Sequence, residues 1–216
     1  MAWAETERQS LVQTLRTTDP DGATLCTGWD ARHVLAHLVQ REQMPASSIG
    51  DVIDKQLAKR PPGEEKYLGR LVEGAASPTG YEALVRRFAA GPPRWSPMKW
   101  GAERISLLEY VIHHEDIRRG STPVPARELP AEMADAVWTK LPAMVRLSYR
   151  GCPVGVTLAR PGGAVQVVKT GTGSVVLTGE PVELALYVTG RRAAASVQVS
   201  GTPGDVAAFE SWASKR

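Results

Sequence analysis

The first part of the chain repeats apolar residues at helical spacing. In residues 5–17 and 30–42 they recur three and four positions apart, and Asp30 is the expected N-cap of the second segment. Similar segments follow, separated by stretches rich in proline and glycine. The pattern predicts amphipathic helices over residues 5–17, 30–42, 80–90, 103–120 and 130–149, with Pro142 marking a bend or a boundary.

The pattern changes near residue 150. Four Val-rich segments, bounded by glycines, alternate between apolar and polar positions, which predicts strands over residues 154–159, 164–170, 174–179 and 196–201. Two further segments, 181–192 and 203–216, each open with a proline, a favourable first residue of a helix. We therefore expect an α+β chain with a helical bundle in residues 1–150 and a small α+β domain in residues 151–216.

The amino-acid composition argues against some classes of function. The 26 basic residues are nearly matched by 23 acidic ones, so the net charge of +3 does not favour a nucleic-acid partner. The basic, aromatic stretch 86–100 is interrupted by prolines and is expected to form a loop on the bundle surface. No apolar run is long enough to span a membrane, and no signal sequence is evident.

Cys26 and Cys152 are the only cysteines. Two cysteines far apart in the sequence do not form a disulfide framework and are typical of a reducing compartment. We expect two separate buried thiols in a cytoplasmic protein.

One short run, "LLEYVIHHEDIRR", concentrates groups that could bind a metal. Glu109 and His113 are four residues apart, so they share a helix face, and this face lies beside the apolar stripe of the segment. His37 lies among apolar residues of the second predicted helix. Histidines and a carboxylate directed into a bundle must be paired or metal-bound, and two imidazoles with one carboxylate suit zinc or another first-row divalent ion. The alternative is that they are ordinary polar residues of the core boundary.

The neighbouring polar residues have less direct expected roles. Asp116 is near the same face and is expected either to hydrogen-bond a ligand histidine or to cap a neighbouring loop. His33 is either a second such partner or a solvent-side residue. Helical phase predicts that His114 and Glu115 face away. Arg118 and Arg119 are expected to be the cations that favour a helix C-terminus.

Three segments resemble a known family. "LCTGWDARHVLAHLVQRE" and "LEYVIHHEDIRR" are similar to the two motifs of DinB-like proteins related to mycothiol-dependent maleylpyruvate isomerase. "VVLTGEPVELALYVTGRRAAASVQVSG" is similar to the small domain that follows their bundle. "GPPRWSP" ahead of the second motif resembles an actinobacterial subgroup of metal-binding proteins.

The resemblance implies a DinB-like four-helix bundle with a small α/β C-terminal domain. It implies a divalent metal ion, typically Zn2+ with Ni2+ or Mn2+ as alternatives, held by His37, Glu109 and His113. The reacting group would be a metal-bound water or thiol. Arg191 and Arg192, in the "TGRR" turn, are candidate substrate contacts if the second domain closes over the bundle, or plain surface charges.

The function implied by the resemblance is a thiol transferase or isomerase. It would join mycothiol, a low-molecular-weight thiol, to a small electrophile, in a monomer or homodimer. Two alternatives remain open at this point. One is a non-catalytic metal- or thiol-sensing protein of the same fold, and the other is a decayed site whose domains only mediate association.

Overall fold

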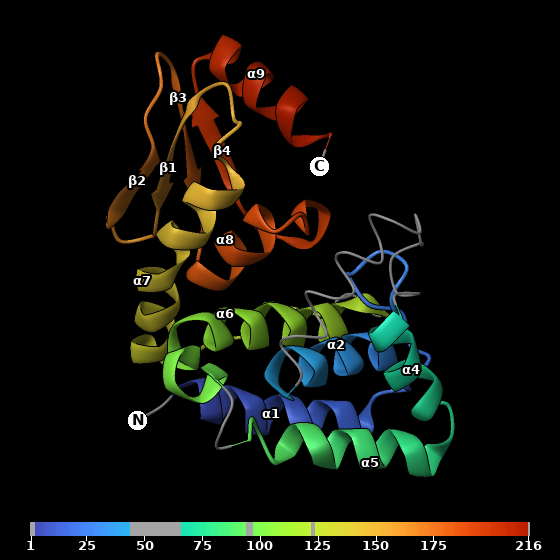
Figure 1. The fold of residues 1–216 in the computed structure, drawn as a ribbon. Helices are drawn as coiled ribbons and strands as arrows, with labels where there is room; N and C mark the ends of the chain where they lie inside the picture. Colours follow the sequence, from blue (N-terminus) through green and yellow to red (C-terminus); the bar gives the residue numbers. More distant parts are fainter. Residues whose placement is uncertain (1–2, 44–65, 94–96, 122–123, 216) are drawn as a thin grey trace. The chain divides into compact units, whose positions relative to one another are not determined.

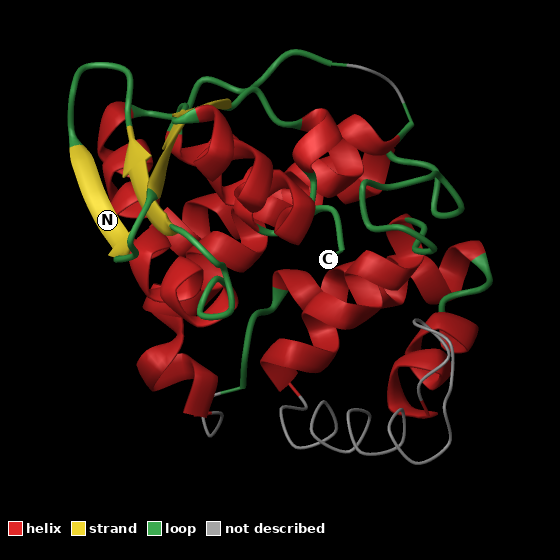
Figure 2. Ribbon diagram, turned by 90° about the horizontal axis from the view of Figure 1, so that it is seen from above, coloured by secondary structure: helices red, strands yellow, loops and turns green. Residues whose placement is uncertain are grey.

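The computed structural model describes residues 3–43, 66–93, 97–121 and 124–215, without the side chains of residues 97–106. It consists of two compact units, Met1–Val124 and Pro125–Arg216. The predicted α+β class is confirmed: helices form the first unit, and the strands, yellow in Figure 2, all lie between residues 155 and 201 of the second. The sequence places the domain boundary at residue 150, whereas the helix before that point lies in the second unit.

Among the residues that the structure describes, the bundle of the first unit is formed by α1 (Trp3–Thr17), α2 (Ala31–Gln43), α5 (Pro78–Ala89) and α6 (Pro97–Gly120). Helix α1 contacts α5 and α6, and α2 contacts α5 and α6 (Figure 1). Their apolar faces meet in a core that includes Leu15, Leu35, Phe88 and Leu107, each at most 1% exposed. A short helix, α4 (Lys66–Gly74), packs on α2 and α5 and was not predicted.

Helix α2 begins where the sequence predicts. Asp30 Oδ1 accepts a hydrogen bond from the backbone N–H of His33 at 2.8 Å, which confirms Asp30 as the N-cap. Val34, Leu35 and Leu38 are buried, while His33, His37 and Arg41 lie on a partly exposed stripe. The helix therefore presents both histidines along one edge of the bundle.

The connection between α1 and α2 crosses the C-terminal part of α6. The Leu25 N–H donates to the Asp116 carbonyl at 3.0 Å. Next, a tight turn is closed by the Trp29 N–H on the Cys26 carbonyl, with Gly28 at a φ of +80°, a conformation that favours glycine. This loop places Cys26 and Trp29 near the region between α2 and α6.

The second unit combines α7 (Ala131–Ser148), α8 (Pro181–Val188) and α9 (Pro203–Ala213) with one sheet, and the 3-10 turn η1 (Arg192–Ala194) follows α8. The strands are β1 (Gly155–Ala159), β2 (Val165–Lys169), β3 (Ser174–Thr178) and β4 (Gln198–Gly201), ordered β2-β1-β3-β4. β1 and β3 are parallel, with Val156 opposite Val175, and both outer pairs are antiparallel.

Helix α7 packs on α8 and β2, which explains why it groups with the sheet rather than with the bundle. The helix runs through Pro142 without a break, so no boundary occurs there. Every residue of α8 is buried, which suits a helix that is covered on all sides. None of the described helices is long and apolar enough to span a membrane.

Candidate metal centre

His37, Glu109 and His113 come together between α2 and α6. One potential ligand atom from each lies within 4.8 Å of the other two. Glu109 Oε2 is 3.7 Å from His37 Nε2 and 3.8 Å from His113 Nε2, and the two imidazole rings meet edge to face with centroids 5.2 Å apart. The structure thus brings His37 next to Glu109 and His113, which lie about seventy residues later in the sequence.

The spacing of these atoms fits ligands of one ion better than hydrogen bonds. A nitrogen and a carboxylate oxygen that hydrogen-bond lie about 2.7–3.2 Å apart. Two ligands of a tetrahedral zinc ion, each at about 2.0–2.1 Å, lie roughly 3.3–3.4 Å apart. The distances of 3.7 and 3.8 Å exceed the zinc value by only a few tenths of an ångström, which small rotamer adjustments can remove.

Glu109 Oε2 is a buried oxygen with no hydrogen-bond partner among the described residues. Such an atom is costly unless something else binds it. Burial raises the pKa of the carboxyl, but the neighbouring His37, His113 and Arg41 outweigh this and bring it to about 2. The carboxylate is therefore ionised at neutral pH and is available to a cation.

His37, on the neighbouring helix α2, is also suited to binding a metal ion. Burial lowers the pKa of His37 below its ordinary value, with Glu109 opposing the shift, so the ring is neutral at neutral pH. A neutral imidazole nitrogen and an ionised carboxylate are the forms that bind divalent metals. The residues present therefore fit a zinc-type ion.

Arg41 adds a positive charge at the rim. Its Nη2 lies 3.5 Å from Glu109 Oε1, and its side chain is 39% exposed. The guanidinium therefore engages the carboxylate oxygen that faces away from the two histidines. This residue has no counterpart in the sequence-based prediction, although its i+4 relation to His37 could have indicated it.

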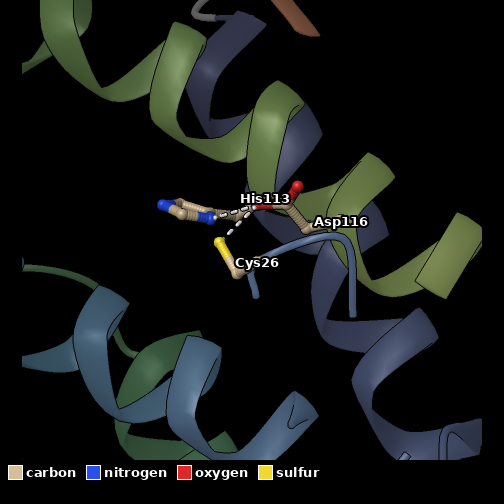
Figure 3. Close-up of side chains that lie close together, drawn as sticks. All are labelled: Cys26, His113 and Asp116. Atoms are coloured by element: carbon tan, nitrogen blue, oxygen red, sulfur yellow. Dashed lines mark hydrogen bonds and ion pairs between the residues drawn. The ribbon is translucent and has the colours of Figure 1, made fainter. Parts of the chain in front are cut away.

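Asp116 hydrogen-bonds to the His113 ring nitrogen that faces away from Glu109. Its Oδ2 lies 2.9 Å from His113 Nδ1 and accepts a hydrogen bond from Cys26 Sγ at 3.2 Å. Figure 3 shows the thiol and the imidazole both directed toward this carboxylate. An ionised Asp116 places the ring proton on Nδ1, which leaves the Nε2 lone pair directed to Glu109 and His37.

Cys26, His113 and Asp116 form a second group whose potential ligand atoms lie within 4.8 Å of one another. The two groups share His113 but use different ring nitrogens. In the second group the atoms already hydrogen-bond to one another, whereas in the first the distances are too long for that. The first group is therefore the better candidate for the ion, and the second is better suited to orienting His113.

His33 and Trp29 complete the surroundings of His37. The Trp29 ring lies 5.2 Å from the His37 ring and stacks on the His33 ring at 6.4 Å, centroid to centroid. His33 Nδ1 lies 2.7 Å from Asp30 Oδ1. His33 thus bonds to Asp30, the N-cap of its own helix. The structure shows no hydrogen bond from His33 to His37, Glu109 or His113 among the described residues, although such a bond was one of the two predicted roles.

The prediction that His114 and Glu115 face away is wrong. His114 is 2% exposed, and its ring nitrogens contact Glu7 Oε1 at 2.8 Å and Thr14 Oγ1 at 2.7 Å. Glu115 is fully buried. Helix α6 is covered by α1 on the side that the helical phase assigns to solvent, and partners from α1 satisfy the histidine.

Arg118 and Arg119, at the end of α6, pair with a specific carboxylate in addition to the predicted general stabilisation of a helix C-terminus by positive charge. Arg118 Nη1 lies 2.9 Å from both oxygens of Glu115, and Arg119 Nε lies 2.5 Å from Oε2. The two guanidinium groups therefore compensate the buried charge of Glu115.

Arg191 and Arg192 are engaged within the second unit. Arg191 Nη1 donates to the Thr189 carbonyl at 2.8 Å. Arg192 Nη1 donates to the Ala213 carbonyl, and its guanidinium lies 5.8 Å from the Tyr187 ring centroid. These contacts fix the end of α8, and the predicted contact with a substrate anion stays a prediction.

Cys26 is the main participant that the sequence did not indicate. Neither cysteine is in a disulfide, as expected, but Cys26 is only partly buried and bonds to Asp116, ninety positions later. Its position in "LCTGW", at the start of the first motif, was the available signal. The predicted surface loop at residues 86–100 lies partly outside the described residues: α5 extends to Ala89, and α6 begins at Pro97.

A helical bundle with two histidines and a glutamate converging from two helices defines the class: a bundle protein with a candidate metal centre. The model of the mycothiol maleylpyruvate isomerase N-terminal domain matches residues 2–118, more than half of the chain. The chain therefore belongs to this family, as the motifs predict. All the residues of the candidate centre fall within the matched part.

Solved structures agree on the fold. The crystal structure of the mycothiol-dependent maleylpyruvate isomerase matches with a TM-score of 0.58 and 16% sequence identity, over 92% of this chain and 90% of that chain. The crystal structure of a histidine-to-alanine mutant of that enzyme gives the same values. No curated protein matches the chain at the same level of significance.

Proposed function

We propose that His37, Glu109 and His113 bind a divalent metal ion, and that the protein uses it to react a low-molecular-weight thiol with a small electrophile. The observation that carries the proposal is the buried Glu109 Oε2, which has no described hydrogen-bond partner and faces the Nε2 atoms of both histidines. Zinc is the first choice, because neutral imidazoles and a carboxylate suit it, with Ni2+ or Mn2+ as alternatives.

Family membership supports mycothiol as the thiol. The matched family and the similar crystal structures carry mycothiol and maleylpyruvate isomerase in their names. A divalent ion in a site with three protein ligands favours the thiolate form of a thiol that approaches it. The proposed activity is that of a thiol transferase or isomerase acting in the cytoplasm, where two unpaired cysteines are unremarkable.

The chain's own residues supply the rest of the site. Asp116 keeps the His113 proton on Nδ1, so that Nε2 stays available to a ligand. Arg41 sits at the partly exposed rim, 3.5 Å from Glu109, where it can meet an anionic group of a thiol or electrophile. The Trp29 ring lies beside the His37 ring, with the two centroids 5.2 Å apart.

The test is metal content together with turnover. Protein purified without a chelator is assayed for zinc, nickel and manganese as wild type, Glu109→Gln and His113→Ala. Glu73→Gln, an exposed glutamate on α4, is the matched control. We expect stoichiometric metal in the wild type and control and its loss in both site variants, whereas equal metal content in all four proteins would refute the site.

The same preparations are then mixed with mycothiol and an α,β-unsaturated ketone. Metal-dependent addition supports the enzyme. Metal-dependent mycothiol binding without turnover supports the non-catalytic alternative instead.

A further inference from the structure

The first turn of α2 contains an aspartate–histidine pair that the proposed metal site does not use. Asp30 Oδ1 accepts the backbone N–H of His33 at 2.8 Å and also lies 2.7 Å from the His33 Nδ1. With Asp30 ionised, the ring proton is on Nδ1, and Nε2 carries a lone pair. Within the described part of the chain, Nε2 has no hydrogen-bond partner, and the side chain is 22% exposed.

This pair lies beside the candidate centre. His33, His37 and Arg41 are spaced four residues apart and form the partly exposed stripe of α2. Side chains four apart on a helix have Cβ atoms about 5–6 Å from each other. The Trp29 ring lies near both histidine rings, with centroids 6.4 Å from His33 and 5.2 Å from His37, so both rings are on the side of the helix that Trp29 faces. His33 is therefore one helical turn from a proposed metal ligand and faces the same rim.

A helix cap alone does not account for the geometry. Capping requires only that Asp30 accept a backbone N–H of the first turn, and that bond is present. The additional bond to Nδ1 fixes the orientation and tautomer of an imidazole whose other nitrogen is partly exposed. A carboxylate that orients a histidine in this way is the arrangement used for general acid–base catalysis.

We infer that His33, oriented by Asp30, is the general acid–base residue of the reaction, an inference that rests on the function proposed above. His33 Nε2 takes the proton of the thiol R–SH. The sulfur electron pair forms a C–S bond to the β-carbon of an α,β-unsaturated carbonyl compound, and the C=C π pair moves to give the enolate. The enolate α-carbon then takes the proton back from His33 Nε2, so no other reactant is needed.

Three substitutions separate this role from capping. His33→Gln keeps a polar side chain but cannot transfer a proton at this position. Asp30→Asn retains a good N-cap and removes the charge that orients the ring. Arg32→Gln alters the residue next to His33 and serves as the control for disturbance of this turn. Each variant, as the zinc-loaded chain of 216 residues, is assayed for metal content, mycothiol affinity and kcat with trans-4-phenyl-3-buten-2-one.

We expect unchanged metal content in all variants and unchanged mycothiol affinity in Arg32→Gln. The kcat should fall by about a hundredfold or more for His33→Gln, as for other general acid–base residues, and by roughly tenfold or more for Asp30→Asn. Arg32→Gln should keep the wild-type kcat. A His33→Gln protein with wild-type kcat would overturn the inference while leaving the proposed function intact, and loss of metal from His33→Gln would overturn it by showing a structural role.

A proton count gives a second readout that does not need turnover. Mycothiol binding is followed by calorimetry in two buffers with different ionisation enthalpies, which measures the protons released. We expect His33→Gln to release more protons than wild type, because wild type retains the thiol proton on His33. Equal release overturns the inference even if the wild type binds mycothiol without turnover. Absence of metal-dependent mycothiol binding in the wild type refutes the proposed function itself, and the inference with it.

Discussion

Asp116→Asn tests whether the carboxylate behind His113 controls metal affinity. Asp116 is fully buried, and its Oδ2 receives two hydrogen bonds, from His113 Nδ1 at 2.9 Å and from Cys26 Sγ at 3.2 Å. An asparagine has nearly the same shape but a neutral oxygen, so it still accepts a bond while losing the charge that makes the imidazole a stronger ligand.

The expected loss follows from the role of that bond. Replacing the hydrogen-bond partner of a metal-binding histidine lowers metal affinity by about 10- to 100-fold. At about 1.4 kcal/mol per factor of ten, this is about 1.4–2.8 kcal/mol of binding free energy. Cys26→Ala removes only the second donor to the same oxygen, so its effect should be clearly smaller.

The assay is zinc titration in competition with a chromogenic chelator. Wild type, Asp116→Asn and Cys26→Ala are compared, with Asp135→Asn in the second unit as the matched control. Urea unfolding of the metal-free proteins checks that Asp116→Asn is folded. Unchanged zinc affinity in folded Asp116→Asn would refute the reasoning, as would a loss in Cys26→Ala as large as the loss in Asp116→Asn.

Three further predictions concern stability and are measured by urea unfolding. Gly120→Ala places a Cβ 2.1 Å from the Ala23 carbonyl oxygen and should cost about 1–3 kcal/mol, whereas Gly69→Ala, with nothing within 4 Å, should be neutral or stabilise by up to about 1 kcal/mol. Equal effects of the two would contradict the close packing of the loop on α6. His114→Leu should cost about 1–3 kcal/mol, because it removes a buried partner from two side chains of α1; wild-type stability would argue against that network. Tyr110→Phe removes a hydroxyl that bonds to side chains of α1 and α2 and should cost a similar amount, with no change in metal content.

The candidate ligands could be found from the sequence because each lies on a helix whose phase is visible in its apolar residues. Glu109 and His113 lie beside buried Leu108 and Ile112, and the structure places them next to His37. Periodicity gives the face of a helix, and the motif resemblance supplied the long-range pairing that periodicity lacks.

Periodicity failed where a helix is covered on more than one side. His114 and Glu115 lie on the face of α6 that a single apolar stripe assigns to solvent, but they are buried and paired. Glu7, which contacts His114, lies more than a hundred residues earlier. Ion pairs across such distances leave no local pattern, because each partner alone resembles a surface residue.

The geometry of the loop between α1 and α2 could not be predicted from the sequence either. Cys26 meets Asp116 only because the α1–α2 connection crosses α6, where a Cβ on Gly120 would lie 2.3 Å from Thr24 Cα. The grouping of α7 with the sheet depends on its contacts with α8 and β2, whereas composition changes only after the helix ends.

X-ray absorption spectroscopy of the zinc-loaded protein tests the central claim most directly, because the two groups that share His113 differ in one element. Ligation by His37, Glu109 and His113 predicts nitrogen and oxygen neighbours at about 2.0–2.1 Å and no sulfur from the protein. A sulfur neighbour at about 2.3 Å in the absence of added thiol would assign the ion to Cys26 and contradict the proposed site.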